Sequence, residues 1–464
     1  MTLRVLEFND NGLRVSNDTG VLHTSPGYAL VLPQKIAFGD SARSQSRLNP
    51  LNSYNQYWHK LSVDSFAKPI GHFRHNADLA FSHLQHFAEQ AQIEGDVLLA
   101  LPGSFGRQQM AILLGLLKQS PLNPIGIVDA GLVATVDRHE AETILHADLE
   151  LHQVVLSKLR KIGNTWQREA VLLVPSVGWE NISENLMQLF TSAFIQQCRF
   201  NPQHNASSEQ MLFDSLPEYL QEEQTEQVSD EIEESKRSLK IKLRHNDTLH
   251  EINLPRSHLY SRLNGFYQKI LQQIESLDSD GRSPLFISDR LGQLPQVVEV
   301  LAQSQGQRRE VTLLPADAVA MACLRYSDVV ASNAEGVRFV SQLASKHTAS
   351  VTPMPPKQRL RATHLLCANT ALPLREGILI SQEDANGELG FSIIKGKSLP
   401  MPSAATKLAT IELQEGEYVV QASDPLKING IAVAGSAQMN LGDNLQFANL
   451  SQTLQLIAVQ EHDA

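Results

Sequence analysis

Short apolar runs separated by turn-forming residues dominate the start of the chain. Residues 2–8 (TLRVLEF) and 13–16 (LRVS) are predicted to be the two strands of a hairpin. The intervening Asn9-Asp10-Asn11-Gly12 supports this prediction, because Asn and Gly tolerate the positive φ angles of tight turns. Residues 28–32 (YALVL) add a third strand.

Apolar residues then recur at helical spacing and in short buried runs. Leu79, Leu84 and Phe87 fall on one face of a predicted helix over 77–92. The next predicted elements are a strand at 96–101, a helix at 105–118 and a strand at 125–128. A succession of strand, helix and strand implies a parallel sheet covered by helices.

A second round of similar elements begins near Thr143. Strands are predicted at 152–156, 170–174, 285–288 and 311–314, and helices at 182–197, 296–304 and 316–330. Between them, strands at 239–243 and 248–253 and a helix at 257–277 form a smaller α+β unit. The acidic run over 218–234 is expected to be a solvated helix or a flexible insertion.

The pattern changes at Pro353-Met354-Pro355-Pro356. Beyond it, short strands of alternating polarity are separated by turns at Asn386-Gly387, Asn429-Gly430 and Gly442-Asp443. This spacing predicts a compact all-β domain. We therefore expect one domain over 1–345, a linker over 346–360 and a β-sandwich over 361–464.

Length and composition agree with more than one domain, since 464 residues exceed what one hydrophobic core usually serves. The formal charge of −11 argues against binding to nucleic acid or anionic membranes, which both need a basic face. No apolar run reaches the length of a transmembrane helix, so direct membrane insertion is not expected. Three scattered cysteines, Cys198, Cys323 and Cys367, favour a reducing cytoplasm over a disulfide framework or a zinc site.

Four histidines, His72, His75, His83 and His86, lie close together in the sequence. No cysteine or paired carboxylate completes a metal site beside them. We therefore interpret them as part of a partly exposed helix face, and no metal site is expected elsewhere.

The segment 39–50 (GDSARSQSRLNP) resembles the Gly-Asp-x-Ala-x-x-Gln-x-x-x-Asn-Pro run near the start of DnaK-type (heat-shock protein 70) chaperones. Later blocks at 97–117, 126–136, 286–301 and 315–330 are similar to that family in the same order, so the resemblance spans about 1–345. It implies a two-lobed actin-like (ribonuclease H-like) ATPase fold with a nucleotide cleft between the lobes. Lobe I would cover about 1–145 and 315–345, and lobe II about 146–314.

In such a cleft, two glycine-rich hairpins bring bare backbone N–H groups against the phosphates, because a Cβ would block the approach. The first hairpin should read Asp-x-Gly-Thr-Thr, but here it reads Glu7-Phe8-Asn9-Asp10-Asn11. The second should read Asp-Leu-Gly-Gly-Gly-Thr, but here it reads Asp148-Leu149-Glu150-Leu151-His152-Gln153. Bulk and the charge of Glu150 would both oppose a triphosphate.

Two other parts of the family's site also differ from this sequence. The catalytic lysine aligns nearest to Trp58, with Lys60 two residues away. The glycines that contact adenosine correspond to Ser288-Asp289.

One part of the family's site agrees. Glu233, Lys236 and Arg237 match its Glu-x-x-Lys-Arg adenine clasp. The alternative interpretation is the charged end of a helix within the acidic segment. Adenosine contacts without a phosphate cradle would give weak nucleotide binding at best.

Residues 426–448 (LKINGIAVAGSAQMNLGDNLQFA) resemble the last strands of forkhead-associated domains, and the resemblance covers about 364–460. The Gly-Arg pair with which that family binds phosphopeptides is missing, because the corresponding region reads GILISQED. Phosphate recognition favours an arginine in a polar loop, and Arg375 is close only in sequence. This pattern favours a docking sandwich without phosphothreonine recognition.

Together these resemblances imply a non-catalytic, chaperone-like scaffold or adaptor in a cytoplasmic assembly, a pseudo-ATPase that binds protein partners through its C-terminal β domain. No catalytic residue, metal or cofactor is then expected. The alternative is a working ATPase with divergent phosphate loops that uses Glu7, Asp148 and Lys60. ATP and Mg²⁺, if bound, would be held by Glu7, Asn9, Asp148, Glu233, Lys236 and Arg237. A sugar or acid kinase on the same fold ranks third, because it needs the same missing phosphate loops.

Overall fold

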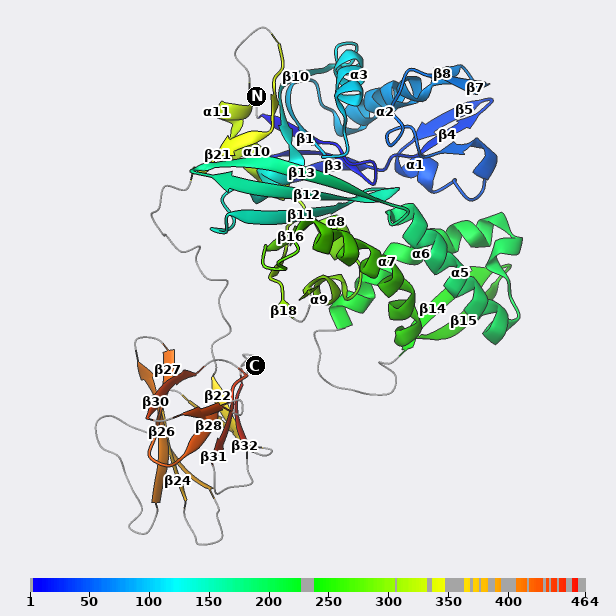
Figure 1. Ribbon diagram of the computed structural model, residues 1–464. Helices are drawn as coiled ribbons and strands as arrows, with labels where there is room; N and C mark the ends of the chain where they lie inside the picture. Colours follow the sequence, from blue (N-terminus) through cyan, green and yellow to red (C-terminus); the bar gives the residue numbers. More distant parts are fainter. Residues whose placement is uncertain are drawn as a thin grey trace. The chain divides into compact units, whose positions relative to one another are not determined.

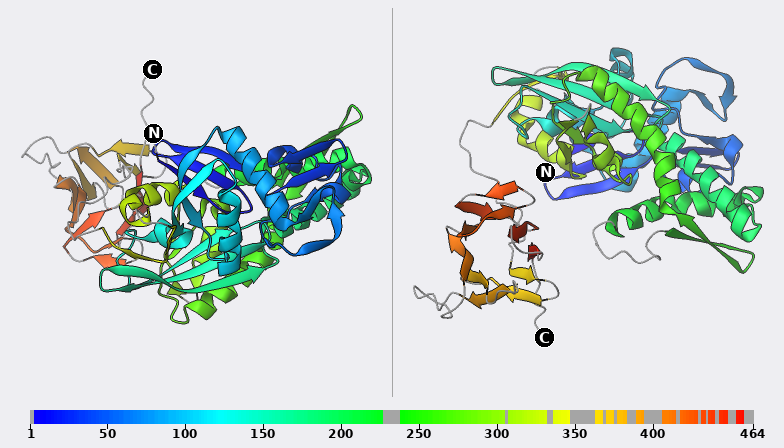
Figure 2. Two further views of the ribbon diagram at one scale, coloured as in Figure 1. Left: turned by 90° about the horizontal axis from the view of Figure 1, so that it is seen from above. Right: turned by 60° about the horizontal axis from the view of Figure 1, so that its bottom comes forward.

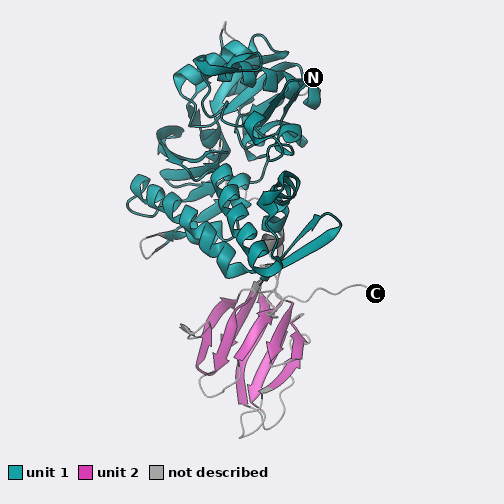
Figure 3. Cartoon of the chain, turned by 90° about the vertical axis from the view of Figure 1, so that its right-hand side faces the viewer, with its two compact units in different colours: residues 1–348 teal, residues 349–464 magenta. Residues whose placement is uncertain are grey.

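The chain divides into two compact units, Met1–Thr348 and Ala349–Ala464 (Figure 3). The computed structural model describes 3–226, 238–304, 307–331 and 336–346 in the first unit. In the second unit it describes 363–367, 370–374, 377–382, 389–393, 406–414, 417–428, 431–433, 435–439, 442–447 and 453–457. The division falls within the predicted linker 346–360, of which all but residue 346 lies outside the described residues.

The first sheet of unit 1 has six strands in the order β20-β10-β9-β1-β2-β3 (Figure 1). Their bounds are β1 (Arg4–Glu7), β2 (Leu13–Asn17), β3 (Gly20–Ser25), β9 (Gly95–Leu101), β10 (Leu122–Asp129) and β20 (Phe339–Val340). The strands β1, β2 and β3 form an antiparallel meander, whereas β1, β9, β10 and β20 run parallel to one another.

The second sheet repeats this arrangement in the order β19-β16-β11-β12-β13-β21. Its strands are β11 (Thr143–Leu149), β12 (Gln153–Ile162), β13 (Thr165–Pro175), β16 (Leu285–Ile287), β19 (Val311–Leu313) and β21 (Gln342–Ala344). Again the first three strands form an antiparallel meander, and β11, β16 and β19 are parallel. The predicted α/β class with parallel strands covered by helices is therefore confirmed.

Helices cover the first sheet because alternate strand residues face opposite sides. Leu99 of β9 packs in a cluster with α2 (Asn76–Ala91) and α3 (Arg107–Leu117). Its neighbour Leu98 belongs to a second cluster, which contains α4 (Ala130–Thr135) and α10 (Ala318–Arg325). This second cluster also includes Ile144 and Trp166 of the other sheet, so α4 and α10 pack against residues of both sheets.

A third core lies on the other face of the second sheet. It buries Leu145 and Ala147 of β11 against three long helices, which gather with a two-stranded hairpin beside that sheet (Figure 2). These elements are α5 (Trp179–Cys198), α6 (Ala206–Glu226), α7 (Arg256–Leu277), β14 (Ser238–His245) and β15 (Thr248–Pro255), with the short helices α8 (Asp289–Gly292) and α9 (Val297–Leu301) beside them. None of the described helices is long and apolar enough to span a membrane.

Several predicted elements differ in detail. The helix predicted over 316–330 is two helices, α10 and α11 (Ser327–Val330), separated at Tyr326. The helix predicted over 296–304 is the shorter α9. Short elements that the sequence did not predict include α1 (Asp40–Arg43), η1 (Pro50–Asn52), η2 (Pro202–His204), β5 (Lys35–Phe38), β6 (Ser53–Tyr54), β7 (Ser65–Ile70), β8 (Phe73–His75), β17 (Gln303–Ser304) and β18 (Gln307–Arg308). The strand predicted over 28–32 is β4 (Ala29–Leu32).

The expectation of a partly exposed helix face for the four histidines holds for His86 of α2 only, because His72 and His75 precede that helix and His83 is buried. The His83 side chain is buried and forms hydrogen bonds with Ser25, Tyr57 and Trp58. Burial, and then the neighbouring His86 and His23, lower the pKa of His83 to about 3. His83 is therefore a neutral core residue.

Unit 2 contains two antiparallel sheets that share one apolar core. One sheet has the order β23-β22-β32-β31-β28-β29 and the other β25-β24-β26-β27-β30. Their strands are β22 (His364–Cys367), β23 (Thr370–Pro373), β24 (Gly377–Gln382), β25 (Leu389–Ile393), β26 (Thr406–Gln414), β27 (Glu417–Ala422), β28 (Leu426–Ile428), β29 (Ile431–Val433), β30 (Ser436–Met439), β31 (Asn444–Phe447) and β32 (Thr453–Ile457). Leu365 of the first sheet and Ile380 of the second belong to the same buried cluster, which makes the unit a β-sandwich.

Candidate functional site

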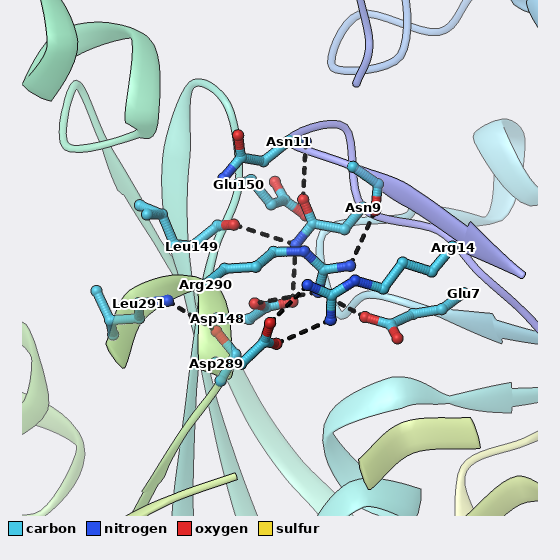
Figure 4. A network of polar contacts seen from close by, with 12 residues as sticks. Glu7, Asn9, Asn11, Arg14, Asp148, Leu149, Glu150, Asp289, Arg290 and Leu291 are labelled. Carbon is cyan, nitrogen blue, oxygen red and sulfur yellow. Dashed lines mark hydrogen bonds and ion pairs between the residues drawn. The ribbon is translucent and has the colours of Figure 1, made fainter. Parts of the chain in front are cut away.

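The turns that follow β1 and β11 face each other, and their polar side chains form hydrogen bonds from one turn to the other (Figure 4). Asn9 Nδ2 donates hydrogen bonds to Asp148 Oδ2 (2.8 Å) and to the carbonyl oxygen of Leu149 (3.1 Å). In return, Asp10 Oδ1 accepts a hydrogen bond from the backbone N–H of Leu151 (2.6 Å). The two turns are therefore hydrogen-bonded to each other.

A buried arginine lies beside these loops. Arg290 belongs to α8, which directly follows β16. Its Nη1 donates to Glu7 Oε1 (2.6 Å) and lies 3.9 Å from Asp148 Oδ1, and its Nη2 donates to the carbonyl oxygen of Gly12 (2.9 Å). Burial opposes the charged guanidinium, but Glu7, Asp148 and Asp289 outweigh that effect and raise the pKa of Arg290 above its ordinary value. One fixed cation thus lies against the carboxylates at the ends of both first strands.

A second arginine, Arg14, forms a bidentate salt bridge with the same helix. Arg14 of β2 donates from Nη1 and Nη2 to the two carboxylate oxygens of Asp289, at 2.8 and 2.5 Å. Its Nη1 also donates to the carbonyl oxygen of Ala316 (3.0 Å). Burial alone would raise the pKa of Asp289, but the bond from Arg14 and the charges of Arg290 and Arg14 hold it below its ordinary value. The first hairpin is therefore joined to α8 through two arginines.

The second loop carries a buried carboxyl group. Glu150 accepts hydrogen bonds from Ser104 Oγ (2.6 Å) and Gln153 Nε2 (2.6 Å). Burial, and then the charge of Asp10, raise the pKa of Glu150 to about 8, so this side chain is mostly protonated at neutral pH. Burial also raises the pKa of Asp10.

A very small cavity lies at the ends of β1 and β11, beside the ion pairs of Arg290, and no residue of the two facing turns lines it. This cavity of about 10 Å³ is bordered by Glu7, Asp148, Asp289 and Arg290, among others. That volume holds about one water molecule at most. Pockets that bind organic ligands are usually of about 300–1,000 Å³.

The residues present do not fit a magnesium-bound triphosphate. The backbone N–H of Asn11 donates to Asn9 Oδ1 (2.8 Å), and that of Leu151 is taken by Asp10, so these donors are not available for phosphate oxygens. Buried atoms Asp10 Oδ2 and Asp148 Oδ1 have no hydrogen-bond partner, and both would repel an anion. The described part of the chain contains no group of three or more His, Cys, Asp or Glu side chains placed to hold a metal ion.

The structure places the other predicted residues elsewhere. Trp58 is buried, contacts the ring of Phe8 edge-on (5.5 Å between centroids) and donates to His83 Nδ1 (3.0 Å). Lys60 is exposed on a groove with Asn76 and does not line the cavity around Arg290. The predicted clasp residues Glu233, Lys236 and Arg237 lie outside the described residues.

The segment with the family-like motif, 39–50, contacts α5 and α6. Arg47 forms ion pairs with Glu180 (3.4 Å) and Glu184 and lies over the ring of Phe213 (4.5 Å to the centroid). Tyr28 of the adjoining hairpin donates to Glu180 Oε2 (2.6 Å). These bonds join the elements that follow the first sheet to the helices beside the second.

Sequence reasoning thus found part of this cluster. Glu7, Asn9 and Asp148 lie together at the facing turns. Arg290 and Arg14 were missed as members of it. One signal in the sequence could have pointed to Arg290. It directly follows Ser288-Asp289, the two positions at which the resemblance leads one to expect glycines that let the backbone approach a ligand.

Neither a protein-family model nor a curated protein sequence matches this chain.

Proposed function

We propose that this chain is a non-catalytic, chaperone-like scaffold or adaptor, a pseudo-ATPase whose nucleotide site is filled by its own side chains. The observation that carries the proposal is the buried Arg290, hydrogen-bonded to Glu7 and 3.9 Å from Asp148, between two loops that are bonded to each other. A guanidinium fixed there takes the place of a bound cation and phosphate chain. Opening the site would expose or unpair buried charges, which is energetically costly.

The strand arrangement supports the actin-like part of the proposal. Five strands of each six-stranded sheet share one arrangement: an antiparallel meander whose first strand is followed across the sheet by two parallel strands, β1-β9-β10 and β11-β16-β19. The sixth strand differs, because β20 pairs parallel with β10 and β21 pairs antiparallel with β13. Such a repeat is what two lobes of an actin-like ATPase would have. We assign lobe I to about 1–145 and 315–345 and lobe II to about 146–314.

The adaptor role rests on unit 2. β-sandwiches of this kind are used for protein docking. We therefore assign protein partners to unit 2. The three cysteines are free, in keeping with the reducing cytoplasm that we propose as the compartment.

Thermal unfolding of the full chain with and without millimolar Mg-ATP tests this proposal. A ligand at a concentration 100-fold above its dissociation constant stabilises the folded state by about 2.7 kcal/mol, which shifts the midpoint by several degrees. We expect no shift. A reproducible shift of that size would favour the alternative, an ATPase with divergent phosphate loops.

A further inference from the structure

A surface groove on unit 1 lies apart from the site around Arg290. It consists of two adjoining hollows of about 400 Å³ and about 610 Å³, and Lys60 and Asn76 line both of them. All the lining residues fall within 53–109, and none belongs to the facing turns or to α8. The small cavity beside Arg290 shares no lining residue with this groove. The groove is therefore a separate feature of the molecule.

Residues of β7 and of the first turns of α2 and α3 line the groove (Figure 1). Side chains of both helices hold the loop that lies between them. Asn76 Nδ2 donates a hydrogen bond to the carbonyl oxygen of Lys60 (2.7 Å), and Gln109 Nε2 donates one to the carbonyl oxygen of His59 (3.4 Å). The backbone at Lys60 is therefore fixed, whereas its side chain is exposed.

The first hollow has an apolar wall. Tyr54, Phe66 and Ile70 line it, are half-buried and pack against the core cluster that contains Leu79. A large apolar side chain placed here would lose contact with water and could pack on the two rings. The rest of the wall is neutral and polar, with Ser53, Asn55, Gln56 and Asn76. Amide side chains both donate and accept hydrogen bonds, so they can bond to the N–H and C=O groups of a peptide backbone.

The second hollow carries an excess of positive charge. Lys60 lines both hollows, Arg107 lines the second at the start of α3, and Asp64 is the one carboxylate among the lining residues. Lys60 and Arg107 are exposed, and neither forms an ion pair with a residue that the structure describes. The groove is therefore locally cationic on a chain whose formal charge is −11. Such a site attracts acidic ligands.

We propose that this groove binds an extended, acidic peptide segment of a partner protein. One large apolar side chain of the peptide lies in the first hollow, and carboxylates that follow it contact Lys60 and Arg107. Two adjoining hollows, one apolar and one cationic, suit neighbouring side chains of one peptide. This inference goes beyond the adaptor function assigned to unit 2 and does not depend on it.

Fluorescence anisotropy of labelled octapeptides, titrated with the full chain, provides the readout. The probe GSGFEEGS carries one phenylalanine followed by two glutamates, and we expect it to bind with a dissociation constant of about 100 μM or tighter. GSGAEEGS lacks the apolar side chain and GSGFKKGS reverses the charge. Each of these two peptides should bind at least about tenfold more weakly than the probe, because each loses one of the two contacts.

Lys60→Glu locates the binding, and Lys118→Glu is the matched control. Lys118 is also exposed, lies at the other end of α3 and lines neither hollow, so both variants change the net charge equally. We expect Lys60→Glu to weaken binding of GSGFEEGS at least about fivefold, while Lys118→Glu leaves it unchanged. Thermal midpoints of both variants show whether they fold.

Three results would overturn the proposal. They are no saturable binding of GSGFEEGS below about 1 mM, equal affinities of GSGFEEGS and GSGAEEGS, and equal affinities of the two folded variants. The last result would place the peptide elsewhere on the chain. A thermal shift with Mg-ATP bears on the adaptor proposal alone, so failure of either proposal is recognised separately.

Discussion

At the scale of single residues, the decisive feature is a buried cation shared by carboxylates from distant parts of the chain. The Arg290 side chain is 5% exposed and that of Glu7 is 6% exposed. Burying such charges is favourable only when each is paired and hydrogen-bonded. The family resemblance aligned Glu7 and Asp148 with the first residues of two equivalent hairpins, but Arg290 is 283 positions from Glu7, and no local pattern links them.

Arg290→Leu should therefore destabilise unit 1 by about 3–5 kcal/mol, because Glu7 and Asp148 lose their buried partner. Urea unfolding followed by tryptophan fluorescence measures the change. Arg160→Leu, at an exposed site, should alter the free energy of unfolding by less than about 0.5 kcal/mol. Equal effects of the two substitutions would show that the Arg290 ion pairs contribute little.

The carboxyl of Glu150 predicts a dependence of stability on pH. Burial raises the pKa of Glu150 in the folded state to about 8, above the 4.5 that is usual for a glutamate in an unfolded chain. The folded state therefore holds an extra proton between these values, and stability falls as the pH rises towards 8. The free energy of unfolding would fall by at most about 1.4 kcal/mol per pH unit.

Urea midpoints at pH 7 and 8 check this prediction. Burial lowers the pKa of histidines such as His146, so above pH 7 they carry no proton in the folded or the unfolded state. They therefore contribute little to the pH dependence of stability in this range. The Glu150→Gln side chain is of similar size and can still form hydrogen bonds with Ser104 and Gln153, but it does not titrate. This substitution should therefore reduce the change of unfolding free energy with pH. A wild-type slope that survives in this variant would rule out Glu150 as its source.

At the scale of elements, the second loop is held in place by the start of α5. The backbone N–H groups of Trp179 and Glu180 donate to the carbonyl oxygens of Glu150 (3.0 Å) and Leu151 (2.8 Å). Gly178 permits this approach, because a Cβ there would overlap the backbone of His152 and Gln153. The loop conformation is therefore set by helix packing as well as by its own residues.

Gly178→Ala should cost about 1–3 kcal/mol, because the helix must move away from the loop. Gly115→Ala is the matched control: it lies within α3, where an added Cβ meets no atom within 4 Å. That change should stabilise the protein by up to about 1 kcal/mol, since alanine favours helices. Chemical unfolding of both variants gives the comparison, and a neutral Gly178→Ala would contradict the close approach.

Periodicity predicted the long elements well, because their apolar faces follow from local spacing. α2, α5 and α7 begin and end within three residues of the predicted bounds. The break between α10 and α11 was not predicted, since its cause is distant. Tyr326 donates to Asp137 Oδ2 (2.5 Å) and accepts from the N–H of Lys346 (2.9 Å), which holds the chain at the end of α10.

At the scale of the whole molecule, the chain has two separately cored units. Three apolar clusters belong to residues before 348, and a fourth contains only residues of the β-sandwich. The alternating pattern after Pro356 predicted the sandwich class. It could not predict the partner, because docking depends on surface chemistry that no periodicity encodes.

The separate cores predict that a fragment of residues 361–464 folds alone. Its far-ultraviolet circular dichroism should show strand structure and a cooperative thermal transition. The midpoint of that transition should equal the midpoint of one of the transitions of the full chain. The complementary fragment 1–346 should keep the remaining transition. Loss of cooperative unfolding in either fragment would mean that the units depend on each other for stability.

The most direct measurement of the central claim is a crystal structure of the full chain grown with Mg-ATP in large excess. The account predicts that Arg290 stays hydrogen-bonded to Glu7 and that Asn9 stays bonded to Asp148, with no nucleotide between the two loops. A triphosphate and its metal ion seated there, with Arg290 displaced, would contradict it.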